Sequence, residues 1–388
     1  MKSYVHSTIA STFAWAGNIY DLTILTYVYT FFAKTFGLDY FSFSILFALG
    51  LIGRALGGTF FGNLADRIGR KPVLVIGTAG YAIFQAALAL SLNVISLFVF
   101  RFLQGVFMGA EWTAGTVIAY ENAPINLRGI ITGIVQAGYG IGYALTGLSY
   151  ILLYQEPRLF LLTGAIPLIL LPYIQFFVKE SKVENSFYIK PRVRDYIPVL
   201  LKATLGMSGM FVAYFAVFGN YETIAYQYLH MNPSTLGLVM LISNIGLAFS
   251  FILFGRLADL FDKRKLIYAG VAGLTVFLVF AIPTIFNSLM VSEAGIIGYA
   301  FSTGFWPLMP LLLAEAVPAE VRGLLSGLSY NIGGFVGGVG NIILGLIGTI
   351  YGIKGLMDAI DGFGFAALAL VVVSVITWPK SGKPIAVS

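Results

Sequence analysis

The sequence repeats one pattern at a spacing of half its length. Residues 121–129 and 315–323 share the frame E-x-x-P-x-x-x-R-G, with an offset of 194 residues in a chain of 388. A second pair, G-N-L-A-D at residues 62–66 and G-R-L-A-D at residues 255–259, recurs with an offset of 193 residues. Two motifs with nearly the same offset predict a duplicated unit, so the chain should fold into two similar halves.

The composition places this duplicated unit in a membrane. Hydrophobic residues make up 58% of the chain and charged residues only 10%, which soluble globular domains do not show. Lipid cannot satisfy open backbone groups, so apolar runs of roughly 20 residues predict membrane-spanning helices. We predict an all-α membrane protein with twelve transmembrane helices in two pseudo-symmetric six-helix bundles. The predicted spans are residues 8–32, 43–64, 73–92, 95–119, 130–154, 159–178, 197–221, 234–254, 266–286, 289–314, 324–349 and 356–377.

The distribution of basic residues predicts the orientation. We expect an N-terminal bundle at residues 1–178, a polar cytoplasmic linker at 179–196 and a C-terminal bundle at 197–388. With the N-terminus inside, eighteen Lys and Arg residues fall on inside segments, whereas the outside loops hold only Lys34, Arg158 and Lys354. This asymmetry predicts a multi-pass protein of the cell membrane with both termini in the cytoplasm.

Several classes of site and partner are disfavoured. The chain has no cysteine, which excludes disulfides, thiolate metal sites and a cysteine nucleophile. Its histidines, His6 and His230, lie outside the predicted spans, so we expect no metal and no cofactor. The net charge of +6 comes from residues between the spans, so membrane orientation explains it better than a nucleic-acid partner. The first apolar run is too long for the apolar region of a cleaved signal peptide.

We expect the protein to be a monomer.

The repeated loops resemble a known signature. The stretch G-N-L-A-D-R-I-G-R-K at residues 62–71 is similar to the signature loop of the major facilitator superfamily. The second copy keeps Asp259 but has Leu260 and Asp262 at the positions of Arg67 and Gly69, so it should be a weaker latch. A functional gate and a structural clamp both fit this network. We expect a cytoplasmic gate built from Gly62, Asp66, Arg67, Gly69, Arg70, Glu121, Arg128, Asp259, Glu315 and Arg322, with Glu121 beside Arg128 and Glu315 beside Arg322.

Other segments narrow the resemblance. Residues 101–112, with R-F-L-Q-G and G-A-E-W, are similar to the fourth span of metabolite:proton symporters. Trp15, Asn18 and Asp21 lie in a first span that resembles the W-x-x-D-x-x-D pattern of sialate, lactate and aromatic-acid proton symporters, with Asn18 in place of the first acid. The resemblance implies two bundles around a central cavity that opens alternately to either side.

Four ionisable residues fall inside the predicted spans: Asp21, Arg54, Arg101 and Glu111. A charge at the bilayer centre costs ~2.5–3.5 kcal/mol, so each should have a partner or line a cavity. The sugar porters pair an aspartate of the first span with an arginine of the fourth, which matches Asp21 and Arg101. We predict that Asp21 binds the coupling proton, with a static ion pair as the alternative. Glu111 is either a proton relay or a structural partner of Arg54 or of a group nearer the cytoplasm.

The substrate contacts are predicted from polar and aromatic residues of the spans. Gln136 matches a substrate-binding glutamine of the sugar porters, and a helix–helix hydrogen bond is the alternative. Further candidates are Arg54, Asn220, Tyr221, Trp306, Tyr330 and Asn331.

The predicted function is proton-coupled symport of a small organic solute. A buried arginine favours an anion, so a small organic acid is the first choice of substrate. A sugar porter, by proton symport or facilitated diffusion, is the alternative. A drug antiporter is disfavoured because residues 133–147 lack the proline of its fifth-span motif. No set of residues suggests an enzyme.

Overall fold

The computed structural model describes residues 2–38, 40–181 and 192–379, and in these residues helices are the only regular elements. The helices of the first half are α1 (Ser3–Ile24), η1 (Leu25–Tyr27), α2 (Tyr29–Phe36), α3 (Tyr40–Ile68), α4 (Arg70–Ala89), α5 (Val94–Asn122), η2 (Ile125–Leu127), α6 (Arg128–Leu153), α7 (Pro157–Leu162), η3 (Thr163–Ile169) and α8 (Leu170–Phe177). Those of the second half are η4 (Val193–Tyr196), α9 (Ile197–Gln227), α10 (Pro233–Ala258), α11 (Lys263–Ala281), α12 (Leu289–Ser302), η5 (Thr303–Phe305), α13 (Leu308–Ala316) and α14 (Ala319–Ile376).

These elements make twelve membrane spans. Nine helical segments of the described chain are long and apolar enough to cross a membrane by themselves. The helices α1 and α6 add two more, although polar residues and glycines lower their hydropathy. The 58-residue α14 contains two spans, because Gly352 interrupts it with a non-helical backbone at φ 71°. The predicted all-α fold is therefore confirmed, and the predicted loop between the last two spans contains this break.

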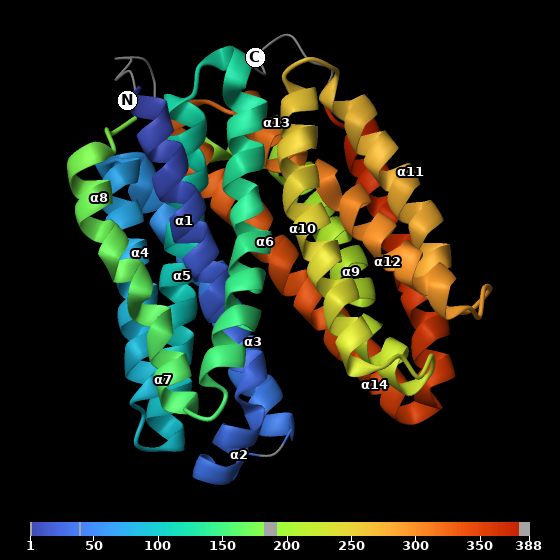
Figure 1. Ribbon diagram of the computed structural model, residues 1–388. Coiled ribbons are helices and arrows are strands. Elements are labelled where there is room, and N and C mark those ends of the chain that lie inside the picture. Colours follow the sequence, from blue (N-terminus) through green and yellow to red (C-terminus); the bar gives the residue numbers. More distant parts are fainter. Residues whose placement is uncertain (1, 39, 182–191, 380–388) are drawn as a thin grey trace.

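The two halves lie side by side as separate bundles, α1–α8 and α9–α14 (Figure 1). The start of α1 and the end of α14 lie at the same end of the molecule. Most of the predicted linker, residues 182–191, lies outside the described residues. Large apolar side chains such as Phe60, Ile151 and Phe176 are exposed, as expected for a surface that faces lipid.

The halves meet along two related helix pairs, α3 with α14 and α6 with α10. Glycines allow each close approach. A Cβ atom on Gly62 would meet the carbonyl oxygen of Gly323 at 2.7 Å, and one on Gly255 would meet that of Gly129 at 2.5 Å. Small residues at such crossings let membrane helices pack backbone to backbone. The duplicated sequence thus forms a duplicated interface.

Candidate functional site

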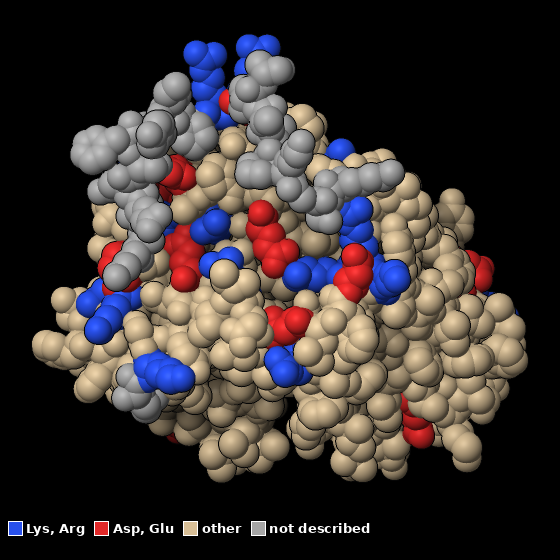
Figure 2. All heavy atoms as spheres, turned by 90° about the horizontal axis from the view of Figure 1, so that it is seen from above, with Lys and Arg blue, Asp and Glu red and all other residues tan. Residues whose placement is uncertain are grey.

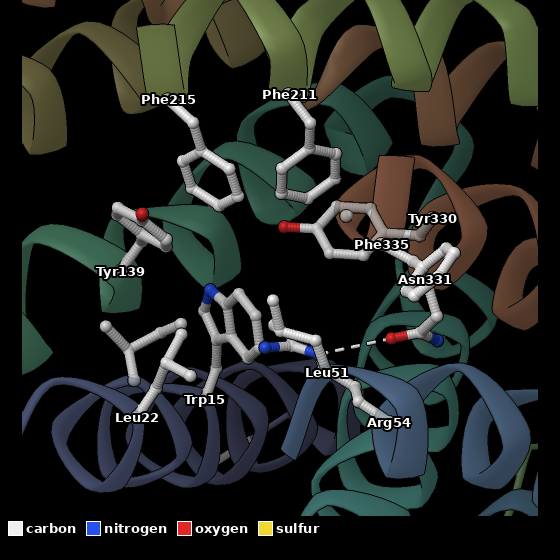
Figure 3. A pocket seen from close by; sticks show the side chains of 12 residues that line it. Trp15, Leu22, Leu51, Arg54, Tyr139, Phe211, Phe215, Tyr330, Asn331 and Phe335 are labelled. Carbon is white, nitrogen blue, oxygen red and sulfur yellow. Dashed lines mark hydrogen bonds between the residues drawn. The ribbon is translucent and has the colours of Figure 1, made fainter. Parts of the chain in front are cut away.

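A small cavity is lined by side chains of both halves (Figure 3). Its volume is about 20 Å³, enough for roughly one water molecule. The walls come from α1, α3 and α6 of the first half and from α9 and α14 of the second. The lining residues are Trp15, Ile19, Leu22, Leu51, Arg54, Tyr139, Phe211, Phe215, Tyr330, Asn331, Gly334 and Phe335. The central pocket defined by these residues is therefore mainly aromatic, with a single cation.

Arg54 joins the two halves at this pocket. Its Nε donates a hydrogen bond to Oδ1 of Asn331 at 3.1 Å (Figure 3), and its guanidinium lies 4.8 Å from the ring centre of Trp15. Its Nη2 is buried and has no hydrogen-bond partner among the described residues. An unsatisfied donor on a buried cation is costly, so this atom can bind an anionic group that enters the pocket.

Aromatic side chains pack against one another beside Arg54. The ring of Tyr330 stacks on Trp112 with the ring centres 3.5 Å apart, and it meets Trp15 edge to face at 6.2 Å. Nε2 of Gln136 donates to the hydroxyl of Tyr330 at 3.4 Å. Gln136 does not line the pocket and reaches it only through this tyrosine. The geometry is therefore that of the predicted alternative, a hydrogen bond between helices.

Three predicted substrate contacts lie outside the pocket lining. Trp306 packs behind it, edge to face against Phe211 at 4.7 Å. Nδ2 of Asn220 donates to Asn341 at 2.8 Å, and the hydroxyl of Tyr221 bonds to Ser292 at 3.2 Å. Both residues therefore contact side chains of the second half, and a role for them in substrate binding stays a prediction.

Asp21 and Arg101 belong to one buried network but do not form a direct ion pair in the described structure. Nη1 of Arg101 donates to Oε1 of Gln104 at 2.7 Å, and Nε2 of Gln104 reaches Oδ2 of Asp21 at 3.5 Å. The predicted pair is therefore indirect. Gln104 follows Arg101 by three residues on α5, so both side chains share one helix face and the amide inserts between the two charges. Gln85 of α4 also accepts a hydrogen bond from Gln104.

Glu111 has a different partner from the one predicted. Its Oε2 accepts a hydrogen bond from Nδ2 of Asn18 at 2.7 Å, and its Oε1 has no hydrogen-bond partner among the described residues. Arg54 forms neither a hydrogen bond nor an ion pair with it there. The asparagine that replaces the first acid of the α1 motif thus supports a carboxyl group on α5.

The repeated loops join the halves at the end of the molecule where α1 begins. We call this end the charged face, because basic and acidic side chains gather between the halves there (Figure 2). Asp66 accepts hydrogen bonds from the backbone of Gly323 and Leu324, both at 2.9 Å. Asp259 accepts equivalent bonds from Gly129 at 2.6 Å and Ile130 at 2.9 Å. Each aspartate therefore binds the positive N-terminus of a helix in the opposite half.

The ion pairs of the charged face differ from the predicted ones. Glu121 pairs with Arg70 at 3.2 Å and with Arg322 of the other half at 2.6 Å. Glu315 pairs with Lys263 at 3.2 Å instead of Arg322. Glu121 thus pairs with an arginine of each half, whereas Glu315 pairs with a lysine of its own half.

Two further arginines predicted for the gate form no ion pair among the described residues. Arg128 packs over Tyr120, with its guanidinium carbon 4.4 Å from the ring centre, instead of pairing with Glu121. Arg67 is exposed and has no ion pair among the described residues. Gly69, also predicted for the gate, separates α3 from α4 and has a left-handed backbone at φ 104°.

The sequence reasoning missed several residues of the site. Glu180 accepts hydrogen bonds from the backbone of Arg70 at 2.8 Å and Lys71 at 3.1 Å, and so caps α4. Its signal was weak, since it lies among the charges of the linker. Gln104 was visible as a polar residue inside a span. The aromatic lining could not be distinguished from aromatic residues that face lipid.

Comparison with known proteins identifies the family. The model of the Major Facilitator Superfamily matches residues 11–202 and 203–385. The sialic acid transporter NanX of Escherichia coli is 25% identical over 382 residues, covering 93% of this chain and 92% of its own. A probable 4-methylmuconolactone transporter of Cupriavidus pinatubonensis is also 25% identical, covering 95% and 88%.

The fold is shared with a solved transporter structure. The solved structure of the proton:xylose symporter XylE superimposes with a TM-score of 0.79 at 15% identity, and the match covers 97% of this chain and 96% of that one. Two matched halves, a pocket between them and a duplicated signature loop agree with this likeness. The chain belongs to the Major Facilitator Superfamily and is a membrane-spanning transporter.

Proposed function

We propose that the protein is a proton-coupled symporter of small organic acids that works by alternating access. It would lie in the cell membrane as a monomer, with the charged face turned to the cytoplasm, as the distribution of basic residues indicates. The observation that carries the proposal is the free Nη2 of Arg54 at a pocket between the two halves. The similar proteins are named as a sialic acid transporter and as a probable 4-methylmuconolactone transporter.

The pocket favours an acid with an apolar body over a sugar. Both ends of the Asn331 amide are used, since its Nδ2 donates to the carbonyl oxygen of Gly327 at 2.9 Å. The hydroxyls of Tyr330 and Tyr139 also have hydrogen-bond partners. A sugar presents hydroxyl groups on all sides, and most of them would lose their hydrogen bonds in such a pocket. A planar monocarboxylate needs only the cation and the aromatic walls.

The arrangement of contacts fits one state of an alternating cycle. The hydrogen bonds and ion pairs between the halves gather at the level of the pocket and at the charged face. In Figure 1, α6 and α10 approach each other toward the charged face and diverge toward the opposite end. We infer that the cytoplasmic side is closed in this state. The cavity of about 20 Å³ must widen before a substrate can enter.

Asp21 is the proposed proton site. It is buried, its Oδ1 has no hydrogen-bond partner among the described residues, and Gln104 links it to Arg101. A carboxyl group with an indirect cation can change between a neutral state and a charge-stabilised state when the bundle moves. That exchange would couple a proton to the conformational cycle.

Uptake into proteoliposomes tests this proposal. With the lumen alkaline, we expect accumulation of benzoate or lactate, and no accumulation of glucose. The variant Asp21→Asn should make accumulation less dependent on the pH gradient while it keeps benzoate–benzoate exchange. Glu156→Gln, which changes an exposed loop acid, is the matched control. Gradient-driven glucose uptake without acid uptake would favour the sugar porter, and an unchanged gradient dependence in Asp21→Asn would remove Asp21 from the mechanism.

A further inference from the structure

Glu111 is a fully buried carboxyl group that the coupling scheme above does not use. Nδ2 of Asn18 donates both to its Oε2 and, at 2.8 Å, to the carbonyl oxygen of Met108. No lysine, arginine or histidine of the described chain forms an ion pair with Glu111. Burying a carboxylate with a single neutral donor costs far more free energy than burying the neutral acid. The contacts of this conformation therefore suit a protonated Glu111.

The titratable groups around Glu111 connect it to the pocket. Those that interact with it electrostatically are Arg54 of α3, Tyr81 of α4 and Tyr330 of α14. Trp112, the next residue on α5, stacks on Tyr330. Arg54 is the single cation in this set, and Asn331 of the opposite half holds its Nε. A movement that separates α3 from α14 would break the hydrogen bond between Arg54 and Asn331. The freed guanidinium could then interact more strongly with Glu111.

We propose that Glu111 is a second proton-binding site, supported by Asn18 and controlled by the position of Arg54. This inference rests on the proposed function. In the conformation seen here Glu111 carries a proton, and Arg54 is available to the carboxylate of the substrate. When the charged face opens, Arg54 leaves Asn331 and the substrate and turns to Glu111. The O–H bond of Glu111 then breaks, its proton leaves through the open side, and the resulting carboxylate pairs with the guanidinium. One proton thus crosses with each substrate in addition to that of Asp21.

Infrared spectroscopy tests the protonated state without any substrate. Wild-type protein in lipid at neutral pH should show the carbonyl stretch of a buried protonated carboxyl group. In an Asp21→Asn background, which removes the other proposed proton site, Glu111→Gln should lose this band and Glu156→Gln should keep it. Asn18→Leu removes the hydrogen bond to Oε2 and should shift the band to higher frequency. The shift assigns the band to Glu111 even if Glu111→Gln fails to fold. A spectrum that neither variant changes would overturn the proposal.

Transport stoichiometry tests whether the proton moves. With the membrane potential clamped at zero, the logarithm of the benzoate accumulation ratio should rise linearly with the pH gradient. Glu111→Gln should halve the slope, as should Asp21→Asn, and the double variant should abolish it. A purely structural Glu111 would change the uptake rate but leave the slope unchanged, and that result would overturn the proposal. If no acid is transported at all, the proposed function fails, while the infrared experiment still decides whether Glu111 binds a proton.

Discussion

Arg54 lines the pocket and also forms a hydrogen bond between the two halves. Its Nε bonds to Asn331 of the second half, its face covers Trp15 of the first, and its Nη2 stays free. Both the binding of an anion and the separation of the bundles would therefore change the contacts of this one side chain. Removing its charge should weaken acid binding while it leaves the fold of each half intact.

The substitution Arg54→Gln should weaken the binding of benzoate. Loss of a charge-assisted hydrogen bond costs about 1.5–3 kcal/mol, so the apparent KM for benzoate should rise roughly 10- to 100-fold. Arg54→Lys keeps the charge but loses the planar fork, and its defect should be intermediate. Uptake at fixed pH measures both variants against Arg158→Gln, a control that removes an exposed cation. An unchanged KM in Arg54→Gln would place the acid elsewhere.

At this scale the sequence predicted which residues carry charge in the membrane but not what they contact. Asp21, Arg54, Arg101 and Glu111 are all buried, as their places in apolar runs indicated. Their partners are neutral amides, and three of the four contacts join distant segments. No spacing rule links Arg54 to Asn331 or Glu111 to Asn18. Only folding brings these segments together, so the pairs were not readable beforehand.

At the scale of elements, apolar length predicted the spans well, whereas helix irregularities were missed. The sixth span changes to a 3-10 turn that contains Pro167, and the tenth changes at Thr303–Phe305. Such breaks depend on local backbone geometry that hydropathy does not report. The sequence alone does not distinguish glycines at helix crossings from glycines without close neighbours. Some of the 45 glycines enable helix crossings, while others, such as Gly246, face open space.

The second prediction compares two glycines of α10. A Cβ atom at Gly255 would meet the carbonyl oxygen of Gly129 at 2.5 Å and the Cα of Gly133 at 3.0 Å, whereas one at Gly246 would meet nothing within 4 Å. Gly255→Ala should therefore push α10 away from α6 and favour opening at the charged face. Gly246→Ala should have no such effect, since alanine is the better helix former.

Thiol labelling measures this opening. The chain has no cysteine, so Leu51→Cys provides a single reporter in the pocket. An impermeant maleimide applied from the charged-face side should label it several-fold faster in the Gly255→Ala background. The same acceleration in Gly246→Ala would show that the crossing does not hold this state closed.

At the scale of the whole molecule, the repeated loops predict two latches of which the second is the weaker, and the two loops of the structure do differ in their ion pairs. Asp66 and Asp259 make equivalent backbone hydrogen bonds, so the predicted weakness of the second loop does not lie there. The two loops differ instead in the ion pairs of their basic residues. Arg70 is wholly buried between Asp66 and Glu121, whereas its counterpart Lys263 reaches only a half-exposed Glu315. The duplicated sequence predicted two copies of the loop, but partner choice depends on how the halves cross.

The last prediction tests this asymmetry with two matched substitutions. The side chain of Glu121 is 8% exposed and receives arginines from both halves, whereas that of Glu315 is 37% exposed and pairs with a lysine of its own half. Removing one partner of a buried charge set costs about 3–5 kcal/mol, and losing an exposed pair costs about 0.2–1 kcal/mol. Glu121→Gln should therefore open the charged face far more than Glu315→Gln.

The Leu51→Cys reporter separates these outcomes when it is labelled from the charged-face side. Because Arg322 reaches Glu121 across the interface at 2.6 Å, Glu121→Gln removes an ion pair between the halves. Labelling should become many-fold faster in this variant. Glu315→Gln leaves every ion pair between the halves in place, so its rate should stay near that of the parent. Equal acceleration in both would mean that the two loops contribute alike, and the closure would then be as symmetric as the sequence.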